Sequence, residues 1–96
     1  MCTYDTTKLT VTGSGKGATG WFTLRDAQIY FDHPVHAPYD HSLNIDLLNA
    51  ELGPSARVAL ELDPHSARDL AESILAALDR APAGLFPAST GTAAAR

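Results

Sequence analysis

The sequence has little of three things: cysteine, basic residues and long apolar runs. Its single cysteine, Cys2, excludes an intramolecular disulfide and a zinc site made only of cysteines. Seven Lys and Arg residues against eleven Asp and Glu give a net charge of −4, which argues against nucleic acid or an anionic membrane as a partner. No apolar stretch approaches the roughly 18–20 residues of a membrane-spanning helix, and the N-terminus lacks the pattern of a secretory signal. We therefore expect a cytoplasmic protein.

The chain is also short: its 96 residues have room for one domain with a modest core. After residue 80 come two prolines, two glycines and an alanine run, with Leu85 and Phe86 as the only large apolar residues that could dock. We expect residues 1–80 to form a single domain and residues 81–96 to be a flexible tail. Because domains of about 80 residues often depend on a metal ion or a second subunit, we also expect a homodimer.

Alternation of apolar and polar residues with period two predicts four strands. They span residues 6–12, 21–32, 42–49 and 57–62. We expect the second strand to be interrupted at Arg25 and Asp26 by a bulge or bend. The loops are short enough for neighbouring strands to run antiparallel.

The glycine-rich block GSGKG, residues 13–17, resembles a phosphate-binding loop only superficially. The Walker pattern G-x-x-x-x-G-K-[ST] requires Ser or Thr directly after the lysine, where this chain has Gly17. Because glycine dominates turns, the block favours a flexible hairpin turn over an anion site at Lys16.

A helix is predicted after the strands. Asp63 is a suitable N-cap, Pro64 fits the first helical position, and Pro82 ends the helix. One apolar stripe recurs at helical spacing; its members are Ala67, Leu70, Ala71, Ile74, Ala77 and Leu78. The fold class is therefore α+β, a four-stranded antiparallel sheet with one C-terminal helix packed across one face.

The opposite face of the predicted sheet is polar. It carries Thr10, Thr12, Gln28, Tyr30, Asn44, Asp46, Arg57 and Glu61. This face meets either water or a second subunit, and Asp46 and Arg57 are placed to form an ion pair, most simply an exposed one.

Three of the four histidines, His33, His36 and His41, lie within nine residues on the loop between strands two and three. By parity, His33 and His41 stand on the same side of the sheet. Three imidazoles on one loop predict a transition-metal site, for zinc, iron or copper, and Cys2 is a fourth candidate ligand because the first strand starts at the same end. The alternative is a polar loop, stiffened by two prolines, that holds its histidines by hydrogen bonds.

Proton transfer at such a site is assigned to Tyr39 or Asp40, with Tyr4 as a further candidate phenol. Asp32 and Asp40 are also expected to orient the imidazoles, and Asp40 is a further candidate for a metal ligand. His65 lies apart from the cluster and is expected to be an exposed residue of the first helical turn.

The blocks MCTY, VTGSGKGATGWF, YFDHPVHAP, HSLNID and GPSARVALEL resemble a family of short, uncharacterised actinobacterial proteins. The resemblance spans residues 1 to about 80 and implies that Cys2, the glycine block and the loop histidines recur in similar proteins. It implies no activity.

Three functions remain open from the sequence. The first is a small metal-binding protein, of which one form is an enzyme of small-molecule or specialised metabolism whose metal activates water or a small-molecule ligand. The second is a non-catalytic module that dimerises or binds a protein through the polar face or a strand edge. The third is a metal-free isomerase or cyclase that uses a loop histidine as general base.

Overall fold

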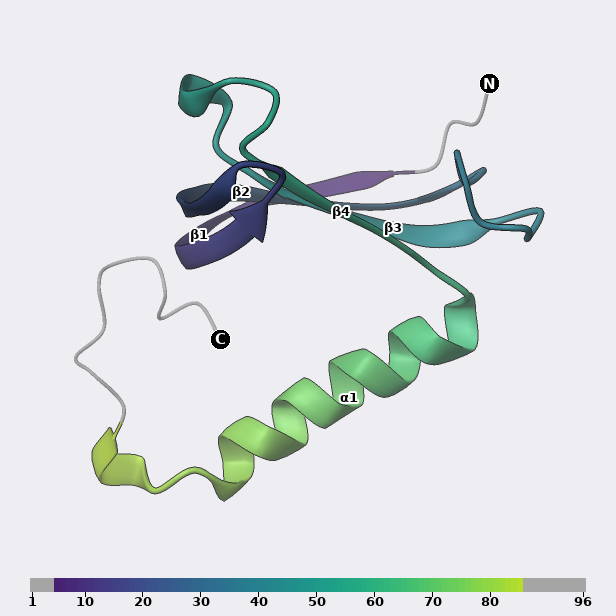
Figure 1. Cartoon of the computed structure of the whole chain (residues 1–96). Helices are drawn as coiled ribbons and strands as arrows, with labels where there is room; N and C mark the ends of the chain where they lie inside the picture. The colour runs from purple at the N-terminus through teal and green to yellow at the C-terminus, as the bar shows by residue number, and fades with distance from the viewer. Residues whose placement is uncertain (1–4, 86–96) are drawn as a thin grey trace.

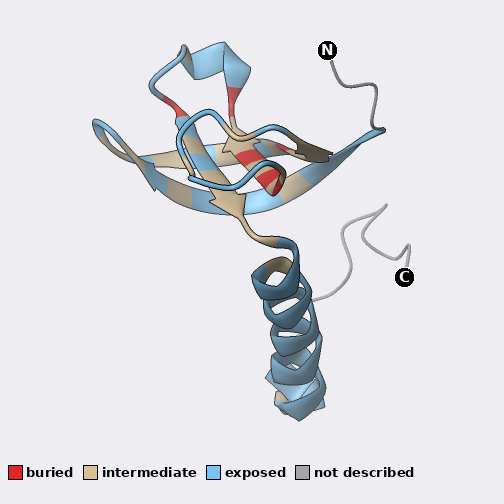
Figure 2. Cartoon of the chain, turned by 90° about the vertical axis from the view of Figure 1, so that its right-hand side faces the viewer, coloured by how far each residue is buried: buried red, intermediate tan, exposed pale blue. Residues whose placement is uncertain are grey.

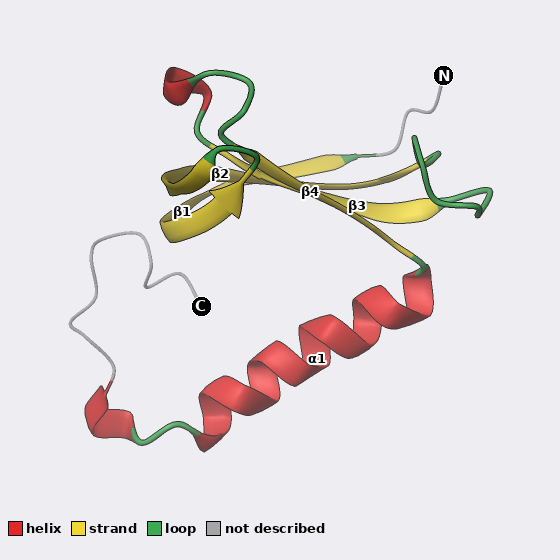
Figure 3. Cartoon of the chain, in the orientation of Figure 1, coloured by secondary structure: helices red, strands yellow, loops and turns green. Residues whose placement is uncertain are grey.

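The computed structural model describes residues 5–85 and has the expected α+β architecture. The strands are β1 (Thr6–Gly17), β2 (Gly20–Asp32), β3 (Ser42–Leu48) and β4 (Arg57–Leu62), and the helix is α1 (Pro64–Arg80). Short 3₁₀ turns, η1 (Ala50–Leu52) and η2 (Ala83–Leu85), precede β4 and follow α1. Figures 1 and 3 show the sheet with α1 lying along one side of it.

The sheet is a simple antiparallel meander in the order β1-β2-β3-β4. Ile45 of β3 lies between Ile29 of β2 and Leu60 of β4, so the odd-numbered apolar residues of β2 and β3 share the face toward α1 with the even-numbered apolar residues of β4. Asn44 and Asp46 point to the other face. The separation of an apolar and a polar face, predicted from the alternation, is confirmed.

The glycine block does not form the predicted turn. β1 continues through Gly17, and the turn contains only Ala18 and Thr19. A bulge is present near Arg25, as expected, but it lies in β1 and not in β2, which is continuous. Thr10 pairs with Asp26 and Gly13 pairs with Leu24. Two residues of β1 therefore lie opposite one residue of β2.

The glycines at the end of β1 allow a close approach to β4. A Cβ atom on Gly17 would lie 2.8 Å from the backbone oxygen of Ser55, and one on Gly15 would lie 3.1 Å from Leu24 Cδ2. The hairpin tip therefore packs against the start of β4 where no larger residue fits. Packing accounts for these glycines without an anion.

The helix begins and ends as predicted. The Asp63 side chain accepts a hydrogen bond from the Ser66 backbone N–H at 2.9 Å, Pro64 is the first helical residue, and the chain leaves the helix before Pro82. No residue of α1 is buried, however, and Figure 2 shows the helix exposed along its length. Among the described residues, no helix is long and apolar enough to cross a membrane.

The best-covered side chains are polar. In residues 5–85 the buried apolar residues are Ala27 and Ala56 alone, whereas Ser42, Asn44, Asp46 and Asn49 are all buried. The expected core beneath the helix is thus only partly closed. Leu85, named with Phe86 as a residue of the tail that could dock, is 73% exposed, and Phe86 lies outside the described residues.

Candidate functional site

The loop between β2 and β3, residues 33–41, turns to the side of the sheet opposite α1 (Figure 1). One carboxylate holds it there. Glu61 of β4 accepts hydrogen bonds from three consecutive backbone N–H groups: Val35 at 2.6 Å, His36 at 3.1 Å and Ala37 at 2.8 Å. These hydrogen bonds lower the pKa of the Glu61 carboxyl below its ordinary value, and the bond from the Ala37 N–H has the largest effect.

His33 and His41 come together as their parity predicts. Their ring centroids are 4.5 Å apart with the planes tilted by 34°, and the His41 ring stacks on Phe31 at 5.6 Å. Both imidazoles therefore lie at the end of the sheet where the loop begins and ends.

A hydrogen bond orients the His33 ring. Its Nδ1 lies 2.9 Å from the backbone oxygen of Asp40, and donation to that carbonyl places the proton on Nδ1. The Nε2 atom is then the basic nitrogen, able to bind a metal ion or accept a proton. The expected orienting role of Asp40 is thus filled by its main chain, while the Asp32 carboxylate accepts the His33 backbone N–H at 2.6 Å.

The other predicted residues are placed differently. His36 is tied to Glu61 through its backbone, Tyr39 is 43% exposed, and Cys2 and Tyr4 lie outside the described residues. Within residues 5–85, no group of three or more His, Cys, Asp or Glu side chains is arranged to hold a metal ion. His65 is exposed in the first turn of α1, as predicted.

A hydrogen-bonded network lies on the polar face beside the loop. Arg57 donates to Asp46 Oδ1 from Nη2 at 2.7 Å and from Nε at 3.1 Å, and the Tyr30 hydroxyl donates to Asp46 Oδ2 at 3.3 Å. The predicted pair is present, but the Asp46 side chain is only 12% exposed against 53% for Arg57. Burial, followed by the Asp46 charge, raises the pKa of the Tyr30 phenol.

The loop and this network border a partly open hollow of about 510 Å³. Its polar lining residues are His33 and His36 from the loop and Tyr30, Asn44, Asp46, Arg57 and Glu61 from the sheet, and its apolar lining residues are Val35, Ala37, Ala59 and Leu60. A volume of this order is typical of small-molecule sites. The sequence placed Tyr30, Asp46 and Arg57 together but did not reveal that Glu61 folds the loop over them.

The structure thus defines a small α+β protein with a loop-covered polar pocket and an imidazole pair at its edge. The chain belongs to the family of unknown function DUF6295, which matches residues 1–87. No curated protein and no solved structure matches the chain.

Proposed function

We propose that the protein binds a divalent transition metal ion at the His33–His41 pair. The observation that carries this proposal is the 4.5 Å separation of the two rings together with the bond from His33 Nδ1 to Asp40. That bond leaves Nε2 as a ligand atom and fixes the ring orientation, which is the usual arrangement of a metal-binding histidine. Zinc, iron and copper all accept imidazole ligands.

The remaining ligands are assigned to His36 and Cys2. His36 lies on the same loop as the pair. Thr6, the first residue of β1, lies opposite Tyr30, so the chain enters the sheet at the histidine end, and Cys2 precedes Thr6 by four residues. A thiolate with two or three imidazoles makes a zinc-, iron- or copper-binding set, and a ligand position left open would admit water or substrate.

The test is the metal content of protein purified without a histidine tag. We expect about one equivalent of metal per chain, lost when His33 or His41 is replaced by alanine, because each supplies one of few ligands. His65→Ala, a change in an exposed histidine on α1, is the matched control and should retain the metal. Metal-free wild-type protein whose thermal unfolding does not respond to added Zn²⁺ would contradict the proposal.

A second candidate function is favoured by the polar pocket. In this reading, the pocket binds a small oxyanion through Arg57, and His33 Nε2 acts as general base without a metal. Acetate and inorganic phosphate are suitable probes, followed by backbone NMR shifts of chelator-treated protein. Shifts around residues 33–37 in the wild type that vanish in Arg57→Leu would support this reading, and unchanged spectra would remove it.

A further inference from the structure

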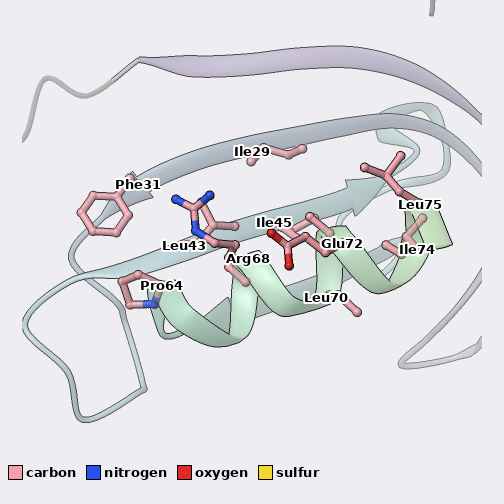
Figure 4. A pocket seen from close by; sticks show the side chains of 12 residues that line it. Ile29, Phe31, Leu43, Ile45, Pro64, Arg68, Leu70, Glu72, Ile74 and Leu75 are labelled. Carbon is pink, nitrogen blue, oxygen red and sulfur yellow. The ribbon is translucent and has the colours of Figure 1, made fainter.

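An open apolar groove runs between α1 and the sheet. Figure 4 shows Ile29, Phe31, Leu43 and Ile45 on the sheet side and Ile74 and Leu75 on the helix side. The groove has a volume of about 630 Å³. The apolar stripe of the helix therefore faces the apolar sheet without closing on it.

The single chain leaves this surface unusually exposed. Leu70 is 41% exposed, Ile74 52%, Leu75 59% and Leu78 47%. Among the described residues no large apolar side chain is buried, since the buried apolar residues are both alanines. A domain of this size depends on burying large apolar side chains, so another surface must cover these.

We propose that a second copy of this chain covers the groove. In this two-fold dimer, α1 and the apolar sheet face of each protomer pack against those of the other. The polar face is not used, because Ser42, Asn44 and Asp46 are already buried within the chain on that side.

The available area fits a stable dimer. A helix of 17 residues is about 26 Å long and about 10 Å across, so its groove-facing half offers about 400 Å². Four strands spaced about 4.8 Å apart, with about six residues each, offer a further 400 Å² or so. The sum, about 800 Å² per protomer, is an upper limit because α1 already covers part of the sheet, and this limit equals the area that each partner buries in a standard specific complex.

Charge at the rim is compatible with self-association. Arg68 and Glu72, one helical turn apart, both border the groove (Figure 4). A two-fold axis that crosses α1 between them sets each Arg68 beside Glu72 of the partner subunit, because an isologous interface pairs each contact twice. The two Arg68–Glu72 pairs formed between the protomers thus favour a dimer with this two-fold axis.

A small apolar ligand in the groove explains the exposed leucines of α1 less well than a second protomer does. Leu78 is 47% exposed but does not border the groove. A ligand inside the groove would leave Leu78 in water, whereas a protomer lying along the whole stripe covers it.

Sedimentation equilibrium on the untagged full chain tests the proposal, with an Ile74→Arg variant in the groove. We expect a wild-type dimer at micromolar concentration and a dissociation constant raised at least about 100-fold in the variant, because the new charge would be buried. Ser73→Arg adds the same charge beside the groove lining and should dimerise like the wild type.

The thermal midpoint of the wild type is the second measurement. A dimer must become more stable as its concentration rises, even if Ile74→Arg fails to fold. A wild-type monomer at about 100 μM, or an Ile74→Arg dimer as tight as the wild type, would overturn the proposal. A monomer that takes up oleate in a one-to-one ratio would make the groove a ligand site instead. His33→Ala, a change outside the groove lining, should remain a dimer, which separates this result from the metal test.

Discussion

Glu61 is the residue that shapes the candidate site. Its carboxylate accepts three successive backbone N–H groups of the loop, 24 to 26 residues earlier in the chain. The loop contains two prolines and little secondary structure, so these bonds define its position over the polar face. Side chains at the pocket therefore depend on a carboxylate that need not contact any ligand.

We predict that the loop loosens in acid. The pKa of Glu61 is lowered in the folded chain, so its contribution to stability is complete above the ordinary carboxyl pKa and is lost as the pH falls through the lowered value. The hydrogen-exchange protection of the Val35, His36 and Ala37 amides, taken relative to the intrinsic rate at each pH, should fall there. Glu61→Gln should show the faster exchange at neutral pH, because an amide supplies only one acceptor oxygen.

Glu51→Gln is the control, since Glu51 pairs with Arg25 at an exposed site away from the loop. It should leave exchange in residues 35–37 unchanged. Loop amides protected equally in wild type and Glu61→Gln would show that the carboxylate does not hold the loop.

Asp46 gives a second prediction at the residue scale. Arg57→Leu leaves the buried carboxylate of Asp46 without a cation and should destabilise the protein by about 1–2 kcal/mol. The loss is smaller than for a fully buried ion pair because the Arg57 side chain is half exposed. Tyr30→Phe removes one hydrogen bond and should cost about 0.5–1.5 kcal/mol. Urea unfolding of both variants measures this, and equal stability of Arg57→Leu and wild type would contradict it.

At the scale of elements, the sequence predicts what depends on local chemistry. The bounds of β4, the Asp63 cap and the first residue of α1 follow from alternation, capping and proline. The meeting of His33 and His41 also follows, because strand parity fixes the side on which each stands.

Interactions between distant segments were not predictable in the same way. Residues 13–17 are poor strand formers by composition, yet they extend β1 by pairing with residues 20–24 of β2. Gly17 also lies close to the backbone of Ser55, far along the chain. The sequence placed Glu61 on the polar face of the sheet. It did not predict the bonds of Glu61 to the loop, because their donors are backbone N–H groups, which every residue except proline has. The periodicity of α1 fixed which face is apolar, not how closely it packs.

The end of β1 gives a test at this scale. Gly17→Ala places a methyl group 2.8 Å from the Ser55 carbonyl oxygen, so the hairpin tip must shift, and we expect a loss of about 1–3 kcal/mol. Gly84→Ala, where a Cβ meets nothing within 4 Å, should be near neutral. Chemical denaturation compares the two, and a Gly17→Ala variant as stable as Gly84→Ala would remove the close-packing role of this glycine.

At the scale of the whole molecule, the two faces of the sheet have different roles. The polar face, covered by the loop, holds the pocket and borders the imidazole pair. The apolar face, partly covered by α1, leaves the surface assigned to the dimer. The proposed metal pair lies where the two faces meet, because His33 borders the pocket whereas His41 stacks on Phe31, a residue that lines the groove. Arg57→Leu, a change within the pocket, should therefore leave the groove unchanged.

The most direct test of the central claim is a calorimetric titration of Zn²⁺ into chelator-treated wild-type protein and the three histidine variants. We expect about one ion bound per chain in the wild type and in His65→Ala, and no comparable binding in His33→Ala or His41→Ala. Absence of binding to the wild type, or unchanged binding in both His33→Ala and His41→Ala, would contradict the assignment of the imidazole pair as a metal site.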